Sequence, residues 1–183
     1  MDGLLLERVP GLPERLHVEV GEQRAVVVPQ AADRRRVADI VSGLDEVPPG
    51  AIVLPGGPVR LVPAEGGLLP HFTVLGNVMH GHLTTQSITR QAAREQSMVQ
   101  AIGCGLEDVL DRYPHEITPG RRRLAGVARA LAAYPRAIVL EDANGLPTWG
   151  SLLSIRPSLD VTSVALLLIT TSTTRTAGFD DAE

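Results

Sequence analysis

The sequence contains no lysine, since all 17 basic residues are arginine, and 21 acidic residues bring the net charge to −4. Chemistry that needs an ε-ammonium group, such as a Schiff base or the phosphate-binding lysine of a P-loop, is therefore excluded. The single cysteine, Cys104, cannot form an internal disulfide, which fits a reducing compartment. We therefore expect a cytoplasmic protein.

Aromatic side chains and long apolar runs are also scarce. The chain has five aromatic residues: Phe72, Tyr113, Tyr134, Trp149 and Phe179. So few aromatics leave little for stacking single-stranded nucleic acid, and an acidic chain attracts DNA poorly. The longest aliphatic run covers residues 164–169, far short of the roughly 20 residues of a spanning helix. The sequence predicts no nucleic-acid partner and no direct membrane insertion.

The pattern of the chain indicates an α/β protein. Its 183 residues suit one domain with its own core. Short strands and one helix fill the first 62 residues, with residues 51–54 and 59–62 expected to form a hairpin, and helical patterns follow, including one over residues 106–113. Two uncharged segments, Ala137–Leu140 and Ser163–Thr170, predict a central, largely parallel sheet. An antiparallel β portion is expected at the N-terminal side.

The expected domain organisation is simple. We predict a single domain over residues 1–175, with a helical subdomain at about residues 73–134 and a flexible tail at residues 176–183.

Three stretches resemble the ATPase subunit of ABC transporters. They are LLPHFTVLGNV (Leu68–Val78), the segment from Arg112 to Ala143, and LLLITTS (Leu166–Ser172). In that family the corresponding pieces are the segment after the Q-loop, the signature helix running into the Walker B strand, and the strand before the switch histidine. The resemblance implies a P-loop NTPase-like ABC ATPase fold that is shortened at its C-terminal end.

The resemblance also locates the phosphate-binding motif of the family, G-x-x-x-x-G-K-[ST]. Its place is taken by Val28, Pro29, Gln30, Ala31, Ala32, Asp33, Arg34 and Arg35. Both motif glycines are missing, Asp33 would direct a carboxylate at phosphate, and Arg35 has no hydroxyl for Mg²⁺. We therefore interpret this segment, called the P-loop position below, as degenerate.

The other nucleotide-handling positions also differ from the family pattern. The Q-loop glutamine falls on Ala64, the Walker B pair on Glu141 and Asp142, and the switch histidine on Thr171. The signature motif falls on Ile117, Thr118, Pro119, Gly120 and Arg121. Pro119 has no N–H to offer a γ-phosphate. The sequence therefore predicts no catalytic residue, no cofactor and no metal ion.

These departures lead to the expected function. We predict a catalytically inactive ABC ATPase-like protein, a pseudo-ATPase that acts as a structural or regulatory subunit. One alternative is a divergent ATP-binding and ATP-hydrolysing subunit in which Arg34 replaces the P-loop lysine and Glu141 or Asp142 organises Mg²⁺. Another is a soluble scaffold or regulator unrelated to transport. Arg34–Arg36 is interpreted either as an anion site or as a solvated helix face.

One segment is the preferred candidate for partner binding. It consists of Leu68, Leu69, Pro70, His71 and Phe72. In the family this region belongs to the groove that receives the membrane subunit, although Phe72 could instead fill the subdomain core. The expected partners are a membrane subunit of an ABC-type transporter, an ABC ATPase-like subunit in a homo- or heterodimer, or both. The protein would then lie at the inner face of the cell membrane.

Overall fold

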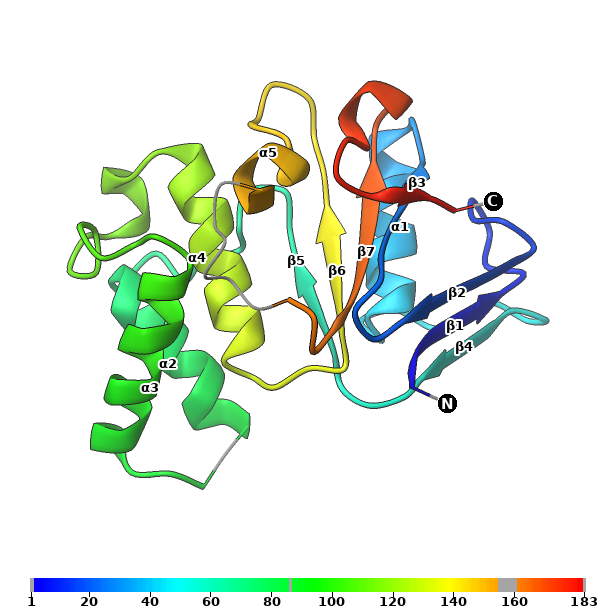
Figure 1. The fold of residues 1–183 in the computed structure, drawn as a ribbon. Coiled ribbons are helices and arrows are strands. Elements are labelled where there is room, and N and C mark those ends of the chain that lie inside the picture. Colours follow the sequence, from blue (N-terminus) through cyan, green and yellow to red (C-terminus); the bar gives the residue numbers. More distant parts are fainter. Residues whose placement is uncertain (1, 86, 155–160, 183) are drawn as a thin grey trace. The chain divides into compact units, whose positions relative to one another are not determined.

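The computed structural model describes residues 2–85, 87–154 and 161–182. They form two compact units (Figure 1). The sheet unit comprises the described parts of residues 1–61, 135–154 and 161–183, and the helical unit those of residues 62–134.

The sheet unit contains an antiparallel sheet and a larger, mainly parallel sheet. The antiparallel sheet has the order β2-β1-β4 and consists of β1 (Gly3–Glu7), β2 (Arg15–Glu19) and β4 (Ile52–Pro55). The larger sheet has the order β5-β6-β7-β3-β8, formed by β3 (Gln23–Val27), β5 (Val59–Val62), β6 (Ala137–Glu141), β7 (Ala165–Thr170) and β8 (Asp180–Asp181). Strand β7 runs parallel to β3 and β6, and β8 runs parallel to β3. The predicted combination of a largely parallel sheet and an N-terminal antiparallel portion is confirmed.

Helix α1 (Ala31–Val41) packs against β6 and β7, as Figure 1 shows. Its buried side chains Val37, Ile40 and Val41 belong to a hydrophobic core that also contains Leu4 and Leu6 of the antiparallel sheet. Every residue of β7 is buried, which explains why this strand carries no charge. Both sheets therefore share one hydrophobic core around α1.

Short helical segments follow the ends of β6 and β7. Helix α5 (Trp149–Ser154) comes after β6, and the 3₁₀ helix η2 (Thr173–Arg175) comes after β7. Gly150 lies so close to the backbone of Ala177 that an added Cβ would sit 1.7 Å from its carbonyl oxygen. Only glycine fits there, so α5 lies close against the residues that follow η2.

The helical unit contains helices α2 (Val74–Thr85), α3 (Arg90–Gly103) and α4 (Pro119–Leu131), with the 3₁₀ helix η1 (Pro114–Glu116) before α4. Helix α2 packs against both α3 and α4. Thr118 caps α4 by accepting a hydrogen bond from the Arg121 N–H, and Pro119 occupies the first turn, as the sequence predicts. Among the described residues, no helix combines the length and apolar character that crossing a membrane requires.

Two local expectations are wrong. Residues 51–54 and 59–62 do not form a hairpin, because β4 pairs with β1 and β5 belongs to the other sheet. Residues 106–113 form turns instead of a helix, since hydrogen bonds such as Val109 N–H to Leu106 O span only three positions. The predicted tail at residues 176–183 stays a prediction; within it, Asp180 and Asp181 pair with β3.

Candidate functional site at the carboxyl edge of the parallel sheet

The carboxyl ends of β3, β6 and β7 bring the predicted P-loop, Walker B and switch positions to one edge of the sheet. The strands are parallel and in register, with Val27 opposite Thr170 and Glu141 opposite Ile169. The residues that follow each strand therefore emerge together. The structure thus collects Val28, Asp142 and Thr171 in one region of the sheet unit.

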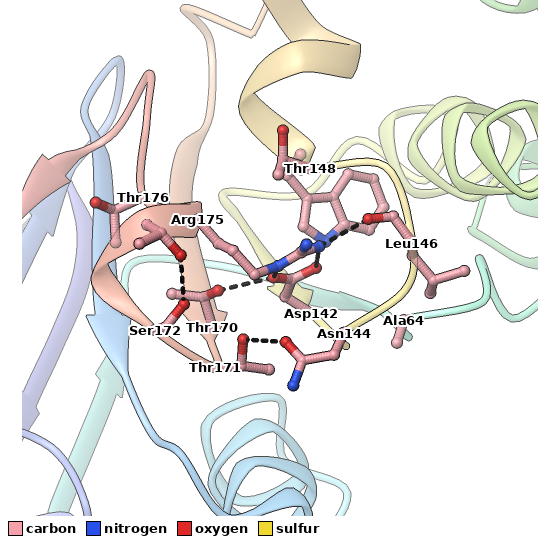
Figure 2. Close-up of polar contacts among 12 residues, drawn as sticks. Ala64, Asp142, Asn144, Leu146, Thr148, Thr170, Thr171, Ser172, Arg175 and Thr176 are labelled. Atoms are coloured by element: carbon pink, nitrogen blue, oxygen red, sulfur yellow. Dashed lines mark hydrogen bonds and ion pairs between the residues drawn. The ribbon is translucent and has the colours of Figure 1, made fainter.

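Asp142 is the buried centre of this region (Figure 2). Its side chain is 1% exposed. One carboxylate oxygen, Oδ2, accepts hydrogen bonds from Thr170 Oγ1 at 2.7 Å and Arg175 Nε at 2.5 Å, and the other accepts one from Arg175 Nη2 at 2.8 Å. The Asp142 N–H also donates to Ile169 O. Both carboxylate oxygens are therefore held by groups of the protein itself.

Arg175 meets Asp142 as a planar fork. The guanidinium also donates from Nη2 to Leu146 O at 3.0 Å, and the side chain is 14% exposed. The hydrogen bond to Asp142 raises the pKa of Arg175, with the attraction of the carboxylate acting in the same direction and burial opposing both. A bidentate arginine–carboxylate pair with little water access is among the stronger polar contacts in proteins. The sequence does not predict this role for Arg175.

Arg34 lies inside the P-loop position and is 6% exposed. Its guanidinium donates to three backbone carbonyl oxygens: those of Val28 at 2.9 Å, Pro29 at 2.6 Å and Asp142 at 3.1 Å. It therefore ties the end of β3 to the end of β6. A solvated helix face is the wrong interpretation for Arg34, since a buried guanidinium must find acceptors and these carbonyls provide them.

Arg35 is exposed and lies beside Glu141, the other member of the acid pair. Its Nη1 lies 3.3 Å from Glu141 Oε2, and its Nε lies 2.9 Å from Asp39 Oδ2 on the next turn of α1. The hydrogen bond to Asp39, followed by the attraction of both carboxylates, raises the pKa of Arg35. The P-loop position and the acid pair, Glu141 and Asp142, are thus joined by an ion pair and by the Arg34 hydrogen bond.

Two further contacts fix the loops that leave this edge. Thr171, at the switch position, donates from Oγ1 to Asn144 Oδ1 at 2.8 Å (Figure 2). Trp149 is completely buried and donates from Nε1 to Glu141 O at 2.9 Å. Asn144 and Trp149 are positioning residues that sequence reasoning missed, although a lone tryptophan shortly after the Walker B strand was an available signal.

The loop between β3 and α1 is short. It contains Val28, Pro29 and Gln30, and the side chain of Gln30 makes no capping hydrogen bond. A cavity of about 360 Å³ lies beside this loop, lined by Pro10, Gly11, Val27, Val28, Pro29, Asp33, Arg36, Val37 and Ile40. Small-molecule sites begin at about this size. Asp33 and Arg36 are its charged residues.

The acid pair, as it lies here, does not fit a divalent cation. Mg²⁺ needs free carboxylate oxygens together with water or phosphate oxygens. Here the Asp142 oxygens accept hydrogen bonds from Arg175 and Thr170, and Glu141 accepts one from Arg35. Within the described residues, no group of three or more His, Cys, Asp or Glu side chains is placed to hold a metal ion.

The remaining predicted positions belong to the helical unit. The carbonyl of Ala64 accepts a hydrogen bond from Arg123 Nε at 2.7 Å. In the signature segment, Thr118 caps α4, and Arg121 binds Asp108 and Gly105 O. These residues are engaged in contacts within the helical unit.

The segment Leu68–Phe72 is attached to α2 through Asn77, which is fully buried. The Asn77 amide accepts from the Leu69 N–H at 2.7 Å and donates to the carbonyls of Leu69, Phe72 and Thr73. Pro70 and His71 are exposed, whereas Leu68, Leu69 and Phe72 are partly exposed. Phe72 is therefore not fully enclosed within the unit.

The chain is similar in sequence to ATP-binding proteins of import and transport systems. No family model matches the chain. It is similar to the Fe(3+) ions import ATP-binding protein FbpC of Yersinia pestis, with 27% identity over 184 aligned residues. The alignment covers 91% of this chain and 52% of FbpC. It is also similar to the glutamine transport ATP-binding protein GlnQ of Escherichia coli K12, with 26% identity over 69% of this chain and 59% of GlnQ. The chain spans about half the length of FbpC.

Solved structures share the fold. The dimeric ATP-binding cassette MJ0796, in a post-hydrolysis state bound to ADP and Pi, gives a TM-score of 0.76 at 16% identity and covers 98% of this chain and 96% of that one. The cbiO1 protein of Clostridium perfringens, part of the ABC transporter complex cbiONQ, gives a TM-score of 0.72 at 15% identity. The match covers 93% of this chain and 79% of cbiO1. The ABC ATPase fold predicted from the sequence is confirmed.

The comparisons correct the functional prediction. The relatives are ATP-binding proteins of import and transport systems, and the MJ0796 structure was captured after hydrolysis. They contradict the prediction of a catalytically inactive pseudo-ATPase, and they do not show a loss of the nucleotide-binding motifs. The relatives and the fold agree with the resemblance to ABC transporter ATPase subunits that the sequence shows.

Proposed function

We propose that this chain is an ATP-binding and ATP-hydrolysing subunit of an ABC-type transport complex. The similarity to FbpC along 91% of the chain is the observation that carries the proposal. The convergence of the P-loop, Walker B and switch positions at one sheet edge agrees with it, because ligands of open α/β sheets bind at the carboxyl ends of the strands.

The site offers both space and positive charge for a nucleotide. The cavity beside the β3–α1 loop has an apolar wall for a base, and Asp33 can accept a hydrogen bond from an amino group there. Arg36 lines this cavity and is exposed near the start of α1, so it can meet phosphate charge. Arg35 is also exposed, and it can meet phosphate charge while its Nε and Nη1 pair with Asp39 and Glu141. Arg34 is committed to backbone carbonyls, so we assign the role of the P-loop lysine to its two neighbours.

Isothermal titration with ATP, with Mg²⁺ and separately with EDTA, tests binding. We expect a dissociation constant below about 100 μM, corresponding to roughly −5.5 kcal/mol. The double variant R35Q/R36Q should bind at least about tenfold more weakly. Arg24 supplies the matched control, because it pairs with Glu22 near the other end of β3, so R24Q should bind normally. Absence of binding at about 1 mM ATP, or equal affinity in the double variant, would contradict the assignment.

Phosphate release tests the hydrolytic half of the proposal. The purified chain alone, and the chain co-expressed with its membrane subunit, should release phosphate from ATP at a rate that R35Q/R36Q lowers and R24Q does not. An unchanged background rate in both preparations would remove hydrolysis from the proposal and leave the binding measurement to stand by itself.

The proposed partners are a membrane subunit and a second ATP-binding subunit. The partly exposed segment Leu68–Phe72 presents apolar side chains, and Asn77 holds its backbone in place. A preorganised apolar segment loses little conformational freedom when a partner docks. Co-purification of a multi-span membrane protein with the wild-type chain, lost in F72A and retained in L83A, would support this assignment; Leu83 is an exposed apolar residue of the same unit. Equal recovery with both variants would contradict it.

A further inference from the structure

The buried carboxylate of Asp142 already carries its own counter-ion. Arg175 contacts both oxygens, through Nε and Nη2, and Thr170 donates to Oδ2 as well. Figure 2 shows the guanidinium lying directly against the carboxylate. A carboxylate with this set of donors has its negative charge neutralised before any ligand arrives.

Arg175 is also held in place from the other side. Its Nη2 donates to Leu146 O in the loop between β6 and α5. The close approach of Gly150 to Ala177 restricts the segment that follows η2. The fork is therefore part of a packed arrangement, in which the guanidinium has one preferred position.

A divalent cation would need the same oxygens. Mg²⁺ and Mn²⁺ bind carboxylate oxygens at short range and cannot share both of them with a guanidinium in the plane of the carboxylate. Displacing Arg175 would leave a buried guanidinium in need of a new acceptor, which is unfavourable. The neighbouring Glu141 offers no substitute, because Arg35 lies 3.3 Å from its Oε2.

We propose that Arg175 competes with divalent cations for Asp142, so that a metal ion joins the acid pair only after Arg175 has released the carboxylate. The guanidinium acts as an internal counter-ion that closes the acid pair to metal. Removal of its charge opens the pair. Because this competition needs no nucleotide, it stands or falls separately from the proposed ATP binding.

Electron paramagnetic resonance of added MnCl₂ tests the competition on the full chain without nucleotide. Wild-type protein and the R24Q control should bind Mn²⁺ weakly, with dissociation constants above about 1 mM. R175Q keeps a polar side chain but removes the charge, and it should bind Mn²⁺ at least about tenfold more tightly. The double variant R175Q/D142N should lose this gain, and added MgCl₂ should displace the ion from R175Q.

Two results would overturn the proposal. One is less than about a tenfold difference between R175Q and wild type, and the other is a gain that persists in R175Q/D142N, which would place the new metal site elsewhere. If R175Q does not fold, R175M replaces it, because methionine has a long, flexible side chain and carries no charge. R175M should then bind Mn²⁺ at least about tenfold more tightly than wild type, and equal binding would overturn the proposal.

Discussion

Each unit has a buried polar side chain that organises the loops around it, and the two side chains differ in charge. Asp142 in the sheet unit is a carboxylate held by the guanidinium of Arg175. Asn77 in the helical unit is a neutral amide that satisfies the backbone of the segment Leu68–Phe72. A buried charge requires its partner, whereas a neutral amide requires only matched hydrogen bonds.

The comparison predicts that loss of the charge at Asp142 has the largest effect on stability. Asp142→Asn keeps the shape but leaves Arg175 without its carboxylate. Breaking one side of a buried ion pair costs about 3–5 kcal/mol of the free energy of unfolding. Urea denaturation followed by the fluorescence of Trp149, which is bonded to Glu141 O in the same unit, measures this loss.

An exposed pair in the same unit supplies the control for that measurement. Asp2 lies 3.1 Å from Arg136, and its side chain is 64% exposed. Asp2→Asn should change the free energy of unfolding by less than about 1 kcal/mol. If the two variants lost equal stability, Asp142 would not be the charged centre of the sheet unit.

Asn77→Ala should have the second largest effect, and it should fall on the helical unit. The variant leaves the Leu69 N–H and the carbonyls of Leu69 and Phe72 without the amide. Unsatisfied buried groups cost about 1–3 kcal/mol. Hydrogen exchange of the Leu69 amide, whose proton is donated to Asn77, should accelerate. Thr84→Ala, which removes an exposed bond to His80 O, should leave that amide unchanged, and equal protection in N77A would contradict the role given to Asn77.

Much of this organisation is readable from the sequence, because local patterns determine it. The uncharged runs of β6 and β7 predict buried parallel strands, and Thr118 followed by Pro119 predicts the start of α4. Parallel strands then bring the P-loop and Walker B positions together without further information.

The roles of the two arginines of the site, Arg175 and Arg34, are not readable in this way. Arg175 is 33 positions from Asp142, and nothing in the residues around it distinguishes it from the other arginines. Arg34 belongs to a run of three arginines that looks solvated, yet it is the buried member of the three. Their roles depend on which loops meet in three dimensions, and hydrophobic periodicity carries no information about that.

The hairpin of β4 and β5 was predicted wrongly for a related reason. A Pro-Gly-Gly turn between two short apolar runs favours a hairpin. Here the same turn carries the chain from the antiparallel sheet to the parallel one. The choice between these outcomes is made by β1 and β6, which lie elsewhere in the sequence.

His82 extends the comparison to pH, because it is a titratable group buried without a counter-ion. It is 2% exposed, and neither ring nitrogen has a hydrogen-bond partner among the described residues. Burial lowers the pKa of His82. As the pH falls through about 6.5, the unfolded chain takes up a proton that the folded helical unit resists, so stability decreases with acidification. The loss is about 1.4 kcal/mol for each unit of the pKa difference.

Urea denaturation followed by circular dichroism at about pH 7.5 and about pH 5.5 tests the effect of His82. The wild type should lose more stability on acidification than H82Q, which has a similar size and no charge to acquire. His80 is exposed, so H80Q should behave as the wild type does. Parallel pH profiles for the wild type and H82Q would show that the ring is hydrated or partnered in solution.

The smallest expected effect belongs to Asp108, a charged residue that differs from Asp142 in exposure. It pairs with Arg121 through a similar fork, but its side chain is 61% exposed. Water and salt screen such a pair, so Asp108→Asn should cost about 0.2–1 kcal/mol at low salt. In about 1 M NaCl, where the screening length is near 3 Å, this difference should nearly vanish, whereas the loss caused by Asp142→Asn should persist. A salt-independent loss for Asp108→Asn would mean that geometry, and not burial, decides how strongly a fork between arginine and a carboxylate stabilises this protein.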